Sequence, residues 1–178
     1  MSTPSVETVG ALCKRYGPGR LPGAANRTVG TGYALAAAAL AAALAFLAVT
    51  GVPRLLFGGS VTVTGGLVYF GLLAIPLVVP AAFVGGAAAE RLLPATTPYR
   101  GPVVGLVATV LTYVVATALV LGLVFASTIP ESTRSITVGS AVSVSLLFGA
   151  FGFFYTSWVT LPVGVVSGYV HERAVATE

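Results

Sequence analysis

The stretch that decides the fold is residues 101–130, GPVVGLVATVLTYVVATALVLGLVFASTIP, which contains no charged residue. A helix rises 1.5 Å per residue, so about 20 residues cross the roughly 30 Å hydrocarbon core of a bilayer. Three further uncharged runs surround this one, at residues 28–53, 55–89 and 135–170. Because lipid offers no hydrogen-bond partners to backbone amides, uncharged runs of this length predict membrane-spanning helices.

The composition of the whole chain indicates the same class of protein. Hydrophobic residues make up 56% of the sequence and charged residues only 8%, whereas a soluble domain carries about a quarter charged residues. Because so few charges could not cover a water-facing surface, the lipid bilayer is the expected partner. The net charge is +4, but the basic residues lie scattered between the apolar runs, which argues against a nucleic-acid partner.

These features predict an all-α, polytopic membrane protein with a four-transmembrane-helix bundle in residues 29–170. An N-terminal segment, residues 1–28, and a tail, residues 171–178, flank it. Seven of the nine Lys and Arg residues fall in these two segments and in the loop between spans two and three. Under the positive-inside rule, both termini of this multi-pass protein of the cell membrane are then cytoplasmic. The spans are expected near residues 29–52, 65–89, 102–126 and 138–170.

The N-terminal segment carries a weaker pattern of its own. Near one helical face fall Val6, Val9, Cys13 and Tyr16, with Lys14 and Arg15 beside it. This pattern is typical of a short amphipathic helix on the membrane surface, and the alternative is a polar leader without regular structure.

An internal repeat is suggested by the ends of spans two and four. Residues 79–91 read VPAAFVGGAAAER and residues 161–173 read LPVGVVSGYVHER, so a constant offset of 82 aligns a proline, a glycine and a Glu-Arg pair. We interpret this as two duplicated helical hairpins related by a parallel pseudo-twofold axis, with coincidence among apolar residues as the alternative. Prolines inside a helix remove a backbone hydrogen bond, so bends are expected at Pro76, Pro80 and Pro162.

Small residues recur at helical spacing and mark candidate packing faces. In lipid, helices associate where small side chains let their backbones approach closely, either within the bundle or between copies. The candidates are Gly30, Ala34, Ala38, Ala42, Ala82, Gly86, Gly164 and Gly168.

No Asp, Glu, Lys, Arg or His lies inside any expected span, so the charged side chains and the histidine gather at the cytoplasmic helix ends. Arginine there suits the negative end of the helix dipole, and a neighbouring glutamate pairs with it. The other reading is hydrolysis or binding of a headgroup phosphate. No catalytic set, metal site or cofactor is predicted. The cluster consists of Glu90, Arg91, His171, Glu172 and Arg173.

The preferred functional interpretation is a non-enzymatic structural or accessory protein, either a homo-oligomer or a subunit that binds another membrane protein. The alternative is a small channel or facilitator for a small solute. A more distant one is an enzyme at the membrane face that uses His171, Glu90 and Glu172. Eight arginines against one lysine suggest a prokaryotic source.

Overall fold

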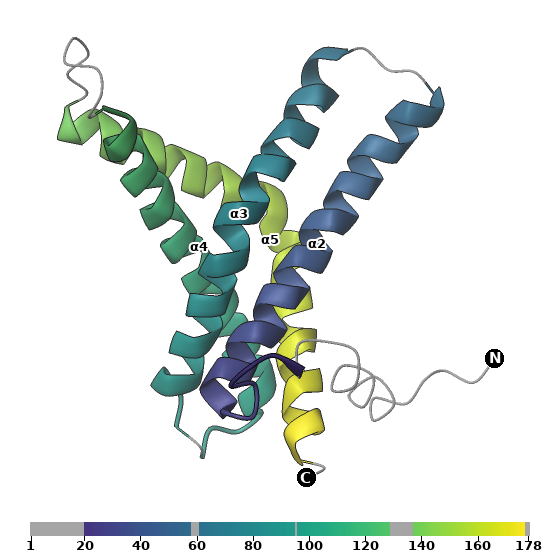
Figure 1. The fold of residues 1–178 in the computed structure, drawn as a ribbon, viewed down its shortest axis with the longest axis vertical. Coiled ribbons are helices and arrows are strands. Elements are labelled where there is room, and N and C mark those ends of the chain that lie inside the picture. The colour runs from purple at the N-terminus through teal and green to yellow at the C-terminus, as the bar shows by residue number, and fades with distance from the viewer. Residues whose placement is uncertain (1–19, 58–60, 95, 129–136, 177–178) are drawn as a thin grey trace.

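The computed structural model describes residues 20–57, 61–94, 96–128 and 137–176. These residues form four helices and no strand: α2 (Arg27–Phe57), α3 (Val61–Leu92), α4 (Arg100–Thr128) and α5 (Val138–Ala176) (Figure 1). All four are long and apolar enough to cross a membrane. The expectation of an all-α chain with four long apolar helices is therefore confirmed.

Each helix extends beyond its expected span, so charged residues that were expected to flank the spans are themselves helical. The spans were drawn to the thickness of hydrocarbon, but backbone hydrogen bonding continues past that boundary whatever side chain follows. The expected surface helix of the N-terminal segment lies outside the described residues.

Two helix starts carry side-chain caps. The Oδ1 atom of Asn26 accepts a hydrogen bond from the amide of Thr28 at 3.0 Å. The hydroxyl of Thr137 accepts one from the amide of Ser140 at 3.3 Å. Asparagine and threonine are favoured at this position because they satisfy backbone donors that have no partner within the helix.

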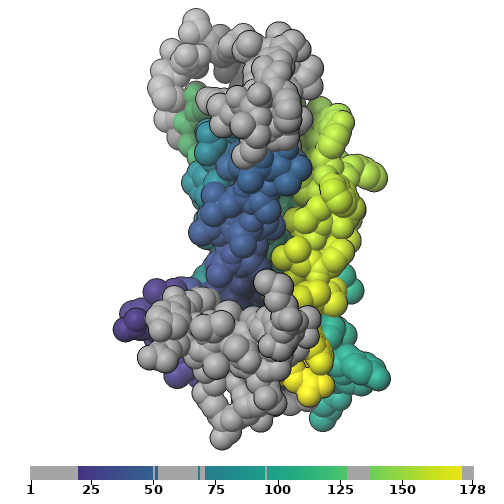
Figure 2. Space-filling view, turned by 90° about the vertical axis from the view of Figure 1, so that its right-hand side faces the viewer, coloured from purple at the N-terminus to yellow at the C-terminus, as the bar shows by residue number. Residues whose placement is uncertain are grey.

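The helices pair as two hairpins, α2 with α3 (the first hairpin) and α4 with α5 (the second hairpin). The hairpins meet where α3 packs on α4 and, less extensively, where α2 packs on α5. Figure 2 shows α2 and α5 side by side on one face of the molecule. We call the end at which α2 and α4 begin and α3 and α5 end the polar end. The hairpins converge at the polar end and diverge toward the opposite end (Figure 1).

Within each hairpin the backbones touch at glycines near the polar end. A Cβ atom added at Gly86 would lie 3.1 Å from the Cα atom of Gly32, and one added at Gly168 would lie 3.0 Å from the Cα atom of Gly105. The small residues around these contacts, such as Ala89 and Ala108, are almost fully buried. In lipid the hydrophobic effect does not drive helices together, so close packing of this kind is what holds them against each other.

The candidate packing residues are distributed unevenly over these contacts. Four of them, Ala82, Gly86, Gly164 and Gly168, are buried between helices. Gly30 is also buried, at the polar end. The alanines of α2 are only half-buried, and this helix approaches α3 through Gly32 instead. The half-buried alanines are Ala34, Ala38 and Ala42.

Of the three prolines expected to bend helices, Pro76 and Pro80 lie inside α3 and Pro162 lies inside α5. Figure 1 shows that α5 changes direction part-way along its length. We attribute this bend to Pro162, since its ring clashes with the carbonyl one turn earlier and it donates no backbone hydrogen bond.

Candidate functional site

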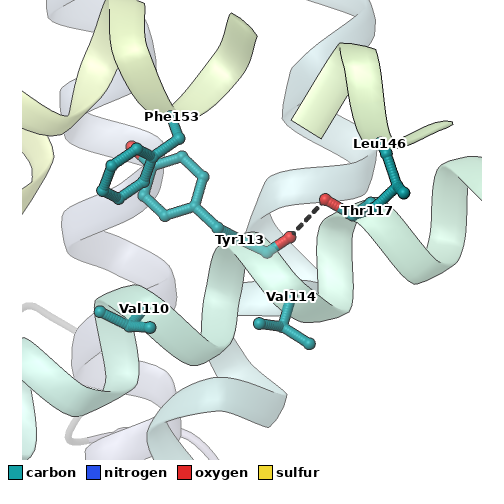
Figure 3. A pocket seen from close by; sticks show the side chains of 6 residues that line it. All are labelled: Val110, Tyr113, Val114, Thr117, Leu146 and Phe153. Carbon is teal, nitrogen blue, oxygen red and sulfur yellow. Dashed lines mark hydrogen bonds between the residues drawn. The ribbon is translucent and has the colours of Figure 1, made fainter. Parts of the chain in front are cut away.

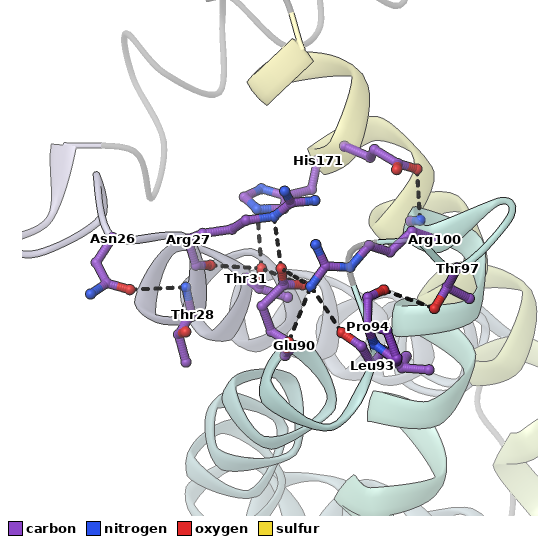
Figure 4. Close-up of polar contacts among 12 residues, drawn as sticks. Asn26, Arg27, Thr28, Thr31, Glu90, Leu93, Pro94, Thr97, Arg100 and His171 are labelled. Carbon is purple, nitrogen blue, oxygen red and sulfur yellow. Dashed lines mark hydrogen bonds and ion pairs between the residues drawn. The ribbon is translucent and has the colours of Figure 1, made fainter.

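Glu90, in the last turn of α3, is the centre of a buried ionic cluster at the polar end (Figure 4). Its Oε1 atom lies 2.7 Å from Nε of Arg27 and 2.9 Å from Nη2 of Arg100. The side chains of Glu90 and Arg100 are only 6% and 10% exposed, whereas that of Arg27 is 46% exposed. One carboxylate is therefore shared by two guanidinium groups that come from the first residues of α2 and α4.

Arg100 also completes the end of α3. Its Nη2 atom donates hydrogen bonds of 3.2 Å to the carbonyls of Glu90 and Leu93. The last carbonyls of a helix have no partner within the helix and carry its negative dipole, so a cation placed there is doubly favoured. The side chain of Arg100 thus joins α4 to α3 by binding both the carboxylate of Glu90 and the backbone carbonyls at the end of α3.

A hydroxyl and an imidazole connect the remaining pair of helices. The Oγ1 atom of Thr31 lies 3.1 Å from Nε2 of His171 and 3.5 Å from Oε2 of Glu90, and it donates a 2.8 Å bond to the carbonyl of Arg27. Thr31 is 1% exposed. We call Arg27, Thr31, Glu90, Arg100 and His171 the polar junction. It takes at least one side chain from each of the four helices.

Glu172 lies beside the polar junction and caps the start of α4. Its Oε2 atom accepts a 2.6 Å hydrogen bond from the amide of Gly101, in the first turn of α4. A carboxylate at a helix N-terminus is stabilised by free amides and by the positive end of the dipole. Tyr99, the residue directly before α4, has φ of 51°, a conformation that costs a bulky residue about 1–2 kcal/mol. The two residues that follow it, Arg100 and Gly101, are both anchored by hydrogen bonds, which explains why this conformation is held.

The structure divides the five residues of the expected polar cluster. Glu90 and His171 lie in the polar junction, and Glu172 caps α4 next to it. Arg91 and Arg173 point outward, and the guanidinium of Arg173 lies 5.3 Å from the ring centroid of Tyr169.

Sequence reasoning missed Arg27, Thr31 and Arg100, because both arginines were used only to count positive charge on one side of the membrane. A signal for them was present. In a bundle of four antiparallel helices, the starts of the first and third lie beside the ends of the second and fourth. Arginines at those starts therefore lie within reach of the glutamates at those ends.

A second polar contact lies further along the bundle, between α4 and α5. The hydroxyl of Tyr113 lies 2.6 Å from Oγ1 of Thr156 and 2.5 Å from Oγ1 of Thr160. Figure 3 shows Tyr113 and Thr117 on the wall of a pocket of about 330 Å³. The Thr117 hydroxyl donates to the carbonyl of Tyr113, so the hydroxyls of this region are bonded to the protein itself.

Removing the Tyr113 hydroxyl is expected to cost little. Hydrogen bonds between helices in lipid contribute about 0.6 kcal/mol each, so Tyr113→Phe should lower the free energy of unfolding by about 1 kcal/mol. Tyr155→Phe, at an exposed position, should leave it unchanged. Reversible unfolding in mixed detergent micelles measures both variants, and equal stabilities would contradict the bonds to Thr156 and Thr160.

Comparison of the chain with protein-family models, with curated proteins and with solved structures finds no match. Within the part of the chain that the structure describes, no three His, Cys, Asp or Glu side chains are grouped as a metal ion requires. The site is thus defined by its own geometry, in which ionic and hydrogen-bonding groups from four helices bind one another, while the buried Nε atom of Arg100 has no hydrogen-bond partner among the described residues.

Proposed function

We propose that this chain is a multi-pass protein of the cell membrane, with its polar end toward the cytoplasm, that acts as a non-enzymatic accessory subunit of a membrane complex. The polar junction is the observation that supports this most directly. Its charged groups bind one another and the helix ends, so they hold the helices together. The distribution of Lys and Arg along the sequence supports the orientation.

The proposal includes an origin by duplication of one hairpin. The offset of 82 residues relates Gly86 to Gly168, and each of these glycines touches a glycine near the start of the preceding helix, Gly32 or Gly105. The same offset relates Glu90 to Glu172, and each carboxylate binds at the start of the first helix of its own hairpin, Glu90 at Arg27 and Glu172 at Gly101. The two hairpins therefore use equivalent positions for equivalent contacts, which supports a common ancestor.

The first half of α5 offers the surface on which a partner would bind. Phe151, Phe154 and Trp158 are all more than half exposed there, beyond the region where the four helices converge. Aromatic side chains, and tryptophan above all, contribute most of the binding energy at protein interfaces. Their concentration on the part of the bundle that diverges from the first hairpin favours a transmembrane partner at this face.

Co-purification from native membranes tests the proposal. In a mild detergent, the chain should carry a partner, or further copies of itself, at fixed stoichiometry. The double variant Phe154→Ala with Trp158→Ala should lose that partner, while Leu123→Ala, at a position on α4 that is also more than half exposed, should keep it. A monomer without a stoichiometric partner would contradict the proposal, and solute flux in liposomes would favour the channel alternative.

A further inference from the structure

An exposed face of α3 carries both of the prolines inside that helix. Residues at intervals of four positions form this face, which we call the proline face of α3: Leu72, Pro76, Pro80 and Val84. Leu72 is 55% exposed and Val84 is 48% exposed. The rest of the described chain therefore leaves the proline face of α3 uncovered.

The two prolines leave backbone acceptors on this face. Proline has no N–H group, so Pro76 gives no hydrogen bond to the carbonyl of Leu72, and Pro80 gives none to the carbonyl of Pro76. Among the described residues, no side chain donates to either carbonyl. Both lie in a stretch that is apolar and long enough to cross a membrane. Because hydrocarbon offers no hydrogen-bond donors, a donor from outside the chain would stabilise this face.

A suitable donor is exposed on the first half of α5. Tyr155 is 67% exposed, and its hydroxyl has no hydrogen-bond partner among the described residues. The offset of 82 residues relates Tyr155 to Leu73, so the two lie equally far from the polar end along their helices. The Tyr155 hydroxyl is therefore at a depth from which it can reach the Leu72 carbonyl of another copy of the chain.

The same offset gives α5 an exposed face equivalent to that of α3. We call it the proline face of α5, and it consists of Phe154, Trp158, Pro162 and Val166. The two faces differ in chemistry. The face of α3 has aliphatic side chains and free carbonyls, whereas the face of α5 has large aromatic side chains with the Tyr155 hydroxyl beside them. Two such unlike faces complement each other, because the donor lies on one and the acceptors on the other.

We propose that the partner of this chain is a second copy of itself. The proline face of α3 in one copy packs against the proline face of α5 in the next, and the Tyr155 hydroxyl donates to the Leu72 carbonyl across the contact. This inference rests on the proposed function and names the partner. Since the two faces differ, the contact is head to tail, and each copy keeps one face for a further copy.

Cross-linking between two populations of the chain tests the pairing of the faces. One population carries Val84→Cys and the other Val166→Cys, both in a Cys13→Ser background that removes the only cysteine. Both valines are exposed, and the offset places them equally far from the polar end. Mixed in liposomes and oxidised, the two populations should form a disulfide, which requires Cα atoms within about 7 Å. Leu106→Cys, at an exposed position as near the polar end on α4, should form none with Val84→Cys.

Self-association in the same liposomes, followed by fluorescence transfer between labelled copies, tests the hydrogen bond. Tyr155→Phe should weaken the association about threefold, the factor for one hydrogen bond between helices in lipid. Tyr99→Phe, exposed outside the helices, should leave it unchanged. Pro76→Ala gives the Leu72 carbonyl a donor within α3, so adding Tyr155→Phe to that variant should have no further effect.

The inference is overturned if no disulfide joins the two populations, or if Val84→Cys bridges only to itself. Equal association of Tyr155→Phe and the parent would also overturn it, as would additive losses for Tyr155→Phe and Pro76→Ala. A chain that is monomeric in liposomes but carries a different protein from native membranes would refute self-association and leave the proposed function standing. A chain that carries neither would contradict both.

Discussion

Glu90→Leu is expected to lower the free energy of unfolding by about 3–5 kcal/mol, the cost of removing one partner from a buried ion pair. The variant leaves the guanidinium of Arg100, whose side chain is 10% exposed, without its carboxylate. Arg27 loses its partner too, but it reaches solvent and adds less. The loss comes mainly from the buried charge that remains, not from the missing attraction.

A double variant separates these two causes. Glu90→Leu combined with Arg100→Leu replaces the buried pair with apolar side chains, which is often neutral in proteins. The double variant should recover much of the loss, although the carbonyls of Glu90 and Leu93 lose their donor. Unfolding of Glu90→Leu, of Arg100→Leu and of the double variant in mixed micelles gives the coupling free energy between the two positions. A cost below about 1 kcal/mol for Glu90→Leu would mean that the carboxylate is exposed in the folded protein.

The four helices could be predicted from the sequence because the property that defines them is local. An uncharged run that is long enough to cross the bilayer can satisfy its backbone hydrogen bonds in lipid only as a helix. The helix ends could not be predicted as well. Arg27 and Arg100 begin their helices and Glu90 lies inside one, since backbone hydrogen bonds do not stop where the hydrocarbon does.

The sequence did not predict how each helix is rotated about its own axis, that is, which of its faces contacts the other helices. A soluble helix shows its buried face as an apolar stripe, but these helices are apolar all round. The alanine stripe of α2 was therefore as good a candidate as Gly32, and only the structure shows that Gly32 faces α3. The partners of Glu90 depend on the same rotations. For this reason the sequence placed Glu90, Arg27 and Arg100 on the same side of the membrane but did not predict that the two arginines bind Glu90.

The last predicted effect concerns the glycine contact inside the second hairpin. A Cβ atom at Gly105 would overlap the carbonyl group of Gly164 and lie 3.2 Å from the Cα atom of Val165. Backbone atoms cannot move aside as a flexible side chain can. Gly105→Ala should therefore push α4 away from α5, at a cost of about 1–3 kcal/mol in the free energy of unfolding, as overpacking does elsewhere.

Gly122→Ala is the matched control, because Gly122 lies on the same helix and a Cβ atom there would meet nothing within 4 Å. This variant should unfold no more easily than the parent, since alanine favours a helix by up to about 1 kcal/mol over glycine. The difference between the two variants, measured in the same micelles, removes the helix propensity that they share and leaves the contact alone. Two equally stable variants would show that α4 and α5 do not touch at Gly105.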